Sequence, residues 1–164
     1  MLRELMRNVN MNKLVMTGNC ELINRTKTAF LCSRKINSGS ILKCYDWATS
    51  LDKDADCVIS GFQSKIERDV LHFLLKKEIP VIVVFGRRMY KKLPDELDEA
   101  HKKGKVLIIS LSDNPRNSIA TAEIRNRYIV DHAENIVFGS LNEESSLYPI
   151  YLNEKEKNNQ IKLL

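Results

Sequence analysis

The chain has 164 residues, of which 43% are hydrophobic and 29% charged, as in an ordinary globular protein. Its 26 Lys and Arg residues exceed its 21 Asp and Glu residues, and the resulting net charge of +5 suits an anionic partner. No run of about 18 apolar residues occurs, which excludes a membrane-spanning helix. The four cysteines and three histidines show no metal-ligand spacing, so we expect a cytoplasmic protein with free thiols and no metal or cofactor.

Short apolar runs recur along the chain and lack the polar alternation of a half-exposed strand. They are residues 28–32 (TAFLC), 57–60 (CVIS), 81–85 (VIVVF), 106–110 (VLIIS) and 136–139 (IVFG). Such runs are typical of strands buried on both faces. Residues 14–17 predict an early strand in a lead-in segment over 1–26, and residues 161–164 predict a last one.

Helical patterns separate the strands. Apolar residues recur at helical spacing over 41–51 and over 66–74, where Ser64 to Glu67 form a capping-box sequence. Pro94 predicts a helix start and Gly104 a helix end. We expect the next helix from about Ser118 to Glu134. The tail over 143–164 predicts a short helix at about 143–156, before the last strand.

Alternation of strands and helices predicts right-handed crossovers and a parallel sheet. We therefore expect an α/β fold, an open, mostly parallel, Rossmann-like sheet with helices on both faces. Residues 1–164 are expected to form a single domain. Ligands of such sheets bind outside the carboxyl ends of the strands, so the loops that follow the strands are the candidate site.

Those loops carry much of the positive charge of the chain. Against the single carboxylate of Asp113 they contribute eight cations: Arg34, Lys35, Lys65, Arg87, Arg88, Lys91, Lys92 and Arg116. Gly61 and Gly86 allow close approach of the backbone to a ligand, and helix N-termini direct N–H groups to the same edge. The pattern predicts phosphate binding, although each loop alone also fits a solvated basic surface or a simple turn. Phe62 and Tyr90 are candidates for stacking on bases or for anchoring their loops.

In the helix expected at 118–134, Asn126 lies on an apolar face with Ile119, Ala122 and Ile129. A buried amide needs hydrogen-bond partners. We expect Asn126 either to hold the neighbouring strand-end loops or to be satisfied within the core.

The two arginines beside Asn126 differ in their helical neighbours. Arg127 has Glu123 four residues before it and Asp131 four residues after it, which favours ion pairs along the helix surface. Arg125 has no such partner, so it is the better candidate for contacting an anion.

No G-x-G-x-x-G, G-x-x-x-x-G-K-[ST], G-x-S-x-G or H-E-x-x-H motif is present, and no catalytic constellation stands out. We therefore do not expect an enzyme.

The ordered motifs over residues 13–142 resemble those of the DprA/Smf family (DNA-processing protein A). The matching stretches are Leu14–Asn19 (L-x-x-K-G-N in the family), Leu31–Arg34 (V-G-[ST]-R), Ile59–Glu67 (V-S-G-x-x-x-G-I-D), Phe85–Gly86 with Leu93–Pro94 (a strand, Gly and a Y-P-like step) and Arg125–Ile129 (R-N-R-I-I). The sequence departs from the family at Cys32 and Lys65, which replace Gly, and at Glu67, which replaces Asp.

The resemblance implies binding of single-stranded DNA in recombination or transformation, a recombinase partner, a homodimer and no catalysis. It places Ser33, Arg34, Gly61, Arg125, Asn126 and Arg127 in or beside the DNA site. By their loop positions, we add Lys65, Gly86, Arg87 and Arg88 as phosphate-binding residues. The sequence leaves open whether the ligand is DNA, RNA or a mononucleotide.

Two alternatives share the superfold. One is a nucleotide-binding sensor, and the other a phosphoribohydrolase-like enzyme with the motif P-G-G-x-G-T-x-x-E. After the strand at 136–139 the chain reads SLNEE, without that glycine loop, so the enzyme is the weaker alternative.

Overall fold

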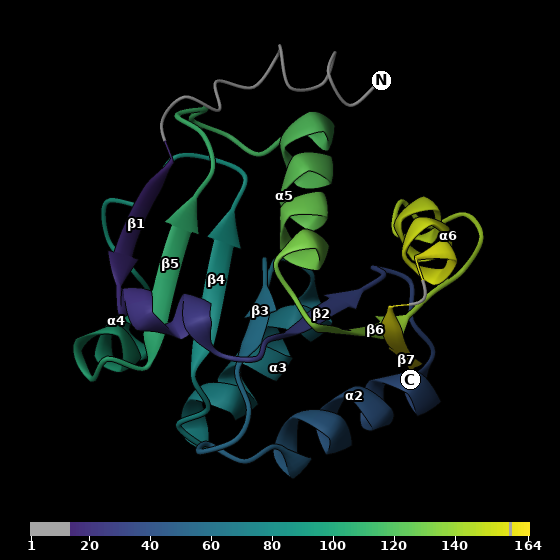
Figure 1. Cartoon of the computed structure of the whole chain (residues 1–164), viewed down its shortest axis with the longest axis horizontal. Helices are drawn as coiled ribbons and strands as arrows, with labels where there is room; N and C mark the ends of the chain where they lie inside the picture. Colours follow the sequence, from purple (N-terminus) through teal and green to yellow (C-terminus); the bar gives the residue numbers. More distant parts are fainter. Residues whose placement is uncertain (1–13, 158) are drawn as a thin grey trace.

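Seven strands form one open sheet in the computed structural model, which describes residues 14–157 and 159–164 (Figure 1). They are β1 (Val15–Gly18), β2 (Thr28–Cys32), β3 (Val58–Ser60), β4 (Val81–Phe85), β5 (Val106–Ser110), β6 (Asn135–Ser140) and β7 (Gln160–Leu163). Their order in the sheet is β1-β5-β4-β3-β2-β6-β7. Only β1 runs antiparallel to its neighbour, β5, so the predicted open, mostly parallel Rossmann-like sheet is confirmed.

Helices cover both faces of this sheet. They are η1 (Cys20–Asn24, a 3-10 helix), α2 (Ser38–Ser50), α3 (Lys65–Lys76), α4 (Asp95–Lys102), α5 (Ile119–Asp131) and α6 (Tyr148–Glu156). Core residues of α2, α3 and α4 pack on one face, and those of η1, α5 and α6 pack on the other. Figure 1 shows α5 in front of the sheet.

The central strands are apolar throughout because helices cover both of their faces. Every residue of β4 and β5 is buried, including Ser110 at the end of β5. In β2, Leu31 packs with the core under α5, whereas Phe30 packs with the core under α2 and α3. Successive side chains of a strand point to opposite faces, so one run of apolar residues supplies both cores.

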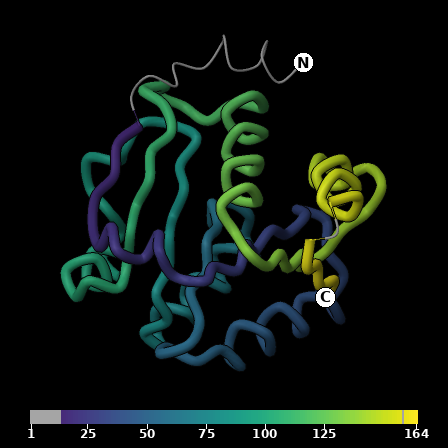
Figure 2. The backbone as a smooth tube through the Cα atoms, viewed as in Figure 1, coloured from purple at the N-terminus to yellow at the C-terminus, as the bar shows by residue number. Residues whose placement is uncertain are grey.

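The chain reverses its direction across the sheet after β5. From β2 to β5 each new strand is added on the same side, with α2, α3 and α4 as the connections. Helix α5 then passes over the opposite face, and β6 pairs with the other side of β2 (Figure 2). The carboxyl ends of β2 and β6 therefore flank the topological switch point, where ligands of open α/β sheets bind.

Local signals set the helix ends largely as predicted. The side chains of Ser64 and Glu67 make the predicted capping box at α3, and Ser118 caps α5 together with Thr121. Gly104 adopts a φ of 74°, which suits a glycine just after a helix.

Three predicted details of the helices are wrong. Ile119 does not lie on a buried face, since it is 89% exposed in the first turn of α5. Helix α5 ends at Asp131, before the predicted Glu134. Helix α6 begins at Tyr148 rather than near residue 143, because the segment before it forms turns and Pro149 lies in its first turn.

The remaining expectations concern the ends of the chain and the thiols. Strand β1 forms within the predicted lead-in segment, whose residues 1–13 lie outside the described part of the chain. Cys20 is an exposed free thiol, and Cys32, Cys44 and Cys57 are buried free thiols. Among the described residues, no helix is long and apolar enough to cross a membrane.

Candidate nucleic-acid interface

The predicted site residues come from neighbouring strand ends and from one helix. Ser33 and Arg34 follow β2, Gly61 follows β3, and Lys65 opens α3. Gly86, Arg87 and Arg88 follow β4, and Arg125, Asn126 and Arg127 lie in the middle of α5. Because β2, β3 and β4 are parallel neighbours, their carboxyl ends lie along one edge, with adjacent ends about 4.8 Å apart.

Arg125 reaches from α5 to the end of β3. A Cβ atom built on Gly61 would lie 2.7 Å from Nε of Arg125 and 2.8 Å from its Cδ. Only glycine therefore leaves room for this side chain. Nε and Nη2 of Arg125 donate hydrogen bonds of 3.2 and 3.1 Å to Oδ1 of Asn126.

Burial lowers the pKa of the Arg125 guanidinium, the charge of Glu67 opposes that effect, and the positive charge of Arg34 adds to it. Its hydrogen-bond acceptor is a neutral amide rather than a carboxylate. Within the described residues Arg125 makes no ion pair, whereas the exposed Lys65 pairs with Asp69 at 2.9 Å. A partly buried guanidinium beside a second arginine favours an incoming anion.

The structure corrects two expectations about the neighbours of Arg125. Asn126 is buried as predicted, but its side-chain oxygen binds Arg125 rather than the strand-end loops. The loop contact is made instead by Arg125, on Gly61. Arg127 does not form the expected ion pairs with Glu123 and Asp131, and its Nε is buried without a hydrogen-bond partner among the described atoms.

Glu67 has a role that we did not predict from the sequence. Its Oε2 accepts the backbone N–H of Cys32 at 3.0 Å, and its Oε1 accepts those of Gln63 and Ser64 at 2.9 and 3.2 Å. One buried carboxylate thus joins the ends of β2 and β3. The capping-box pattern identified the bond to Ser64, but no local pattern could reveal the bond to Cys32, which is distant in sequence.

The same contacts revise the expected use of backbone N–H groups. We predicted that helix N-termini would direct N–H groups to this edge. At the start of α3 the N–H groups of Gln63 and Ser64 bind Glu67, and that of Glu67 binds Oγ of Ser64, so these three are satisfied internally. Side chains such as Arg34 and Arg125 are the other candidates for phosphate contacts at the ends of β2 and β3.

Two serine hydroxyl groups at the end of β5 hold the loop after β4 through its backbone carbonyls. Oγ of Ser112 donates to the carbonyl of Gly86, and Oγ of Ser110 donates to that of Arg87, both at 2.7 Å. The guanidinium of Arg87 lies 4.3 Å from the centre of the Tyr90 ring. Gly86 is needed for packing, because a Cβ there would lie 2.5 Å from the carbonyl oxygen of Thr121.

The two aromatic candidates for base stacking differ. Phe62 is 4% exposed and belongs to the core, so of its two predicted roles it fits loop anchoring and not base stacking. Its φ of 48° turns the chain into the segment that opens α3. Tyr90 is partly buried, with its ring edge-on to Phe85 and one face beside Arg87. A base at this loop would meet the guanidinium of Arg87, whose planar face also accepts stacking.

Ser33 connects the end of β2 with the loop after β6. Its backbone N–H donates to the carbonyl of Ser140 at 3.3 Å, and its Oγ hydrogen-bonds to Oγ of Ser145 at 2.8 Å. Ser33 is buried, whereas Arg34, next along the chain, is exposed. Ser33 thus links the end of β2, next to Arg34, to the loop after β6. No sequence pattern identified its partner Ser145.

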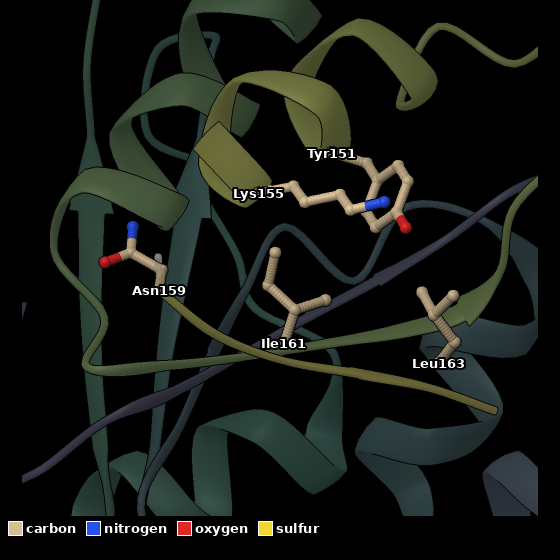
Figure 3. Close-up of a pocket in the computed structure, with 5 residues that line it drawn as sticks. All are labelled: Tyr151, Lys155, Asn159, Ile161 and Leu163. Carbon is tan, nitrogen blue, oxygen red and sulfur yellow. The ribbon is translucent and has the colours of Figure 1, made fainter. Parts of the chain in front are cut away.

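A separate shallow pocket of about 390 Å³ lies between α6 and β7 (Figure 3). It is lined by Tyr151, Lys155, Asn159, Ile161 and Leu163. It contains none of the predicted site residues. Across the residues that the structure describes, no group of three or more His, Cys, Asp or Glu side chains is arranged to hold a metal ion.

Solved structures of two bacterial proteins share this fold. DNA processing protein A (DprA) from Streptococcus pneumoniae superposes with a TM-score of 0.75 at 16% identity, over 92% of this chain and 54% of that one. The structure of DNA processing protein A from Helicobacter pylori concerns a single-stranded DNA binding mode. It superposes with a TM-score of 0.74 at 15% identity, over 93% of this chain and 72% of that one. This chain thus spans about half the length of the first protein.

The family comparison extends over most of the sequence. No curated protein matches the chain. The family model described as DNA recombination-mediator protein A matches residues 2–148. That description is of a recombination mediator and not of an enzyme, in agreement with the prediction from the motifs. The chain belongs to the DNA recombination-mediator protein A family.

Proposed function

We propose that this protein binds single-stranded DNA along the carboxyl edge of its sheet and acts in DNA processing during recombination or transformation. The observation that carries the proposal is Arg125, a partly buried guanidinium that contacts a neutral amide and lies near Arg34. An anionic ligand would compensate both charges. Family membership, together with the single-stranded DNA binding mode named for the similar Helicobacter pylori protein, makes single-stranded DNA the first candidate for that ligand.

A polymer fits the spread of cations better than a mononucleotide does. Arg34 follows β2 and Arg88 follows β4, two strand positions apart in the sheet. At about 4.8 Å per strand, this separation exceeds the reach of one phosphate group. Exposed Arg34 and Arg88, with partly buried Arg87, would neutralise successive phosphates, and Arg125 would bind the one nearest Gly61.

The assembly in the cell forms part of the same proposal. We propose that residues 1–164 act as one domain in the cytoplasm, that the protein forms a homodimer, and that it delivers DNA to a recombinase. Family membership supports the recombination role.

The test is fluorescence anisotropy with a labelled single-stranded oligonucleotide of about 30 bases at low and at moderate salt. We expect micromolar or tighter binding that weakens as salt increases. A panel of mononucleotides, scored by the shift in Tm, is the parallel measurement. Absence of oligonucleotide binding, together with a Tm shift from one mononucleotide, would replace this proposal with a nucleotide sensor.

A further inference from the structure

Two buried thiols share one small space beside β6. Cys32 is the last residue of β2, and Cys44 lies on the buried side of α2. A Cβ atom built on Gly139 would lie 2.8 Å from Sγ of Cys44 and 3.1 Å from Sγ of Cys32. Sγ of Cys32 donates to the carbonyl of Ser33, and Sγ of Cys44 donates to the carbonyl of Gly139, both at 3.4 Å. Because both sulfur atoms contact the same position beside Gly139, they are neighbours.

The two thiols differ in acidity. The neighbouring Cys44 thiol raises the pKa of Cys32, and burial raises it further. The neighbouring Cys32 thiol lowers the pKa of Cys44, although burial opposes the change. Cys44 is therefore the thiol that ionises more readily, and the thiolate is the reactive form of cysteine.

The other two cysteines are placed elsewhere. Cys57 belongs to the core on the opposite face of the sheet from Cys32 and Cys44. Cys20 is exposed on η1, which covers that opposite face as well. The sheet thus separates Cys32 and Cys44 from both other thiols and leaves each as the available partner of the other.

We propose that Cys32 and Cys44 form a reversible disulfide, a redox modification site next to the loop that carries Arg34. The bond would close a ring containing Arg34, Lys35 and Asn37, whose side chain caps α2. It would therefore restrict the loop that presents these two cations. The inference does not depend on the proposed function, because the bond can be detected without any ligand.

Hydrogen peroxide is a sufficient oxidant. The Cys44 thiolate attacks one peroxide oxygen, the O–O bond breaks, and the departing hydroxide takes up a proton to become water. Cys44 is then a sulfenic acid. The sulfur of Cys32 attacks the sulfur of Cys44, its thiol proton passes to the leaving hydroxyl group, and a second water departs. Two thiols are oxidised, and one peroxide is reduced to two waters.

The test treats the full chain with hydrogen peroxide, alkylates the remaining thiols after unfolding, and identifies the tryptic peptides by mass spectrometry. Cleavage after Lys27, Arg34, Lys43 and Lys53 separates the two cysteines. We expect one linked pair of peptides, 28–34 with 44–53, that has lost two hydrogens and is released by a thiol reductant. We also expect Tm to rise by several degrees, because the ring restricts the unfolded chain.

Matched variants separate this pair from general oxidation. Cys57→Ser should still form the linked peptides, and Cys44→Ser should not. Cys20 serves as the internal reference in the wild-type chain, because its thiol is exposed. The inference would be overturned if Cys20 were completely oxidised while Cys32 and Cys44 were still recovered as alkylated, reduced thiols. A disulfide from Cys32 or Cys44 to another cysteine would also overturn it. The wild-type chain alone decides between these outcomes if Cys44→Ser fails to fold.

Discussion

The side chain of Arg125 lies directly against Gly61, with its Nε 2.7 Å from the position of a Cβ on that glycine. Helix α5 thereby contacts the end of β3 through the side chain of Arg125 and the backbone of Gly61. Asn126 fixes the other side of the guanidinium through Oδ1. The position of the Arg125 charge therefore depends on the absence of a side chain at Gly61.

Gly61→Ala should therefore displace Arg125 while leaving the fold intact. The new Cβ meets the flexible part of an arginine side chain rather than backbone, so the side chain moves. We expect oligonucleotide affinity to fall by about tenfold, equivalent to about 1.4 kcal/mol, the scale of one charge-assisted hydrogen bond. Anisotropy titration with thermal unfolding measures both effects.

Gly39→Ala is the matched control for that substitution. A Cβ on Gly39 meets only Oδ1 of Asn37 at 3.4 Å, and the position lies in the first turn of α2. Its affinity should stay at the wild-type value, and its stability should hold or rise by up to about 0.5 kcal/mol. Wild-type affinity in Gly61→Ala would show that the placement of Arg125 does not matter for binding.

Glu67→Gln should destabilise the chain strongly. The amide keeps the shape of the side chain but replaces one acceptor oxygen with a donor, which then faces a backbone N–H of Cys32, Gln63 or Ser64. We expect a loss of about 2–4 kcal/mol in the free energy of unfolding. Denaturant unfolding measures it.

The exposed Glu99 supplies the control for this prediction. Its carboxylate pairs with Lys103 on the surface of α4, and its side chain is 70% exposed. Glu99→Gln should change the free energy of unfolding by less than about 0.5 kcal/mol. Equal effects at the two positions would show that Glu67 does not hold the ends of β2 and β3 together.

The strands and most helix starts could be predicted because their signals are local. The uninterrupted apolar run at 81–85 requires helices on both faces, and Ser64 with Glu67 marks the start of α3 within four residues. The predictions of the end of α5 and the start of α6 were less accurate, because turns and tertiary contacts set such boundaries as much as residue preference does.

The site was harder to predict because its contacts join residues distant in sequence. The motifs brought Arg125, Asn126 and Gly61 to one edge, but they did not show that Arg125 rests on Gly61. Ser33 with Ser145, and Cys32 with Glu67, depend on how loops after different strands meet. The helical spacing around Arg127 predicted ion pairs that the packed helix does not make.

Stability should depend on pH through Asp69. A hydrogen bond from Tyr45 at 2.6 Å holds the pKa of Asp69 below its usual value. A depressed pKa in the folded state contributes stability that is present above the unfolded-state pKa, about 3.9, and is lost as pH falls through the folded-state value. Tyr45→Phe should therefore be less stable than the wild type near neutral pH, and this difference should shrink in acid.

Denaturant unfolding of both proteins from about pH 7 to about pH 3 measures that difference. Thr49→Val, on the same helix, is a control, because the side-chain hydroxyl of Thr49 donates to carbonyl groups of its own helix and not to a carboxylate. A Tyr45→Phe difference that stays constant down to acid pH would contradict the role of the carboxylate.

Gly139→Ala should destabilise the reduced protein. The new methyl group would lie 2.8 Å from Sγ of Cys44 and 3.0 Å from Cζ of Phe30, and both atoms are fixed in the core. We expect a loss of about 1–3 kcal/mol. Cys44→Ala removes the nearest atom, so the double variant should be more stable than the sum of the two single changes predicts. Strict additivity in thermal unfolding would contradict the crowding of the two thiols under Gly139.

The central claim, that arginines at the carboxyl edge bind the phosphates of a nucleic acid, is tested most directly by the salt dependence of oligonucleotide binding. Anisotropy titrations at several salt concentrations would compare the wild type with Arg34→Ala, Arg125→Ala and Lys102→Ala, the last on the far end of α4 and paired with Asp98. For each lost phosphate contact, the slope of log affinity against log salt should become shallower by about 0.7. The account predicts this change for the two arginine variants and a wild-type slope for Lys102→Ala. A wild-type slope in both arginine variants would contradict it.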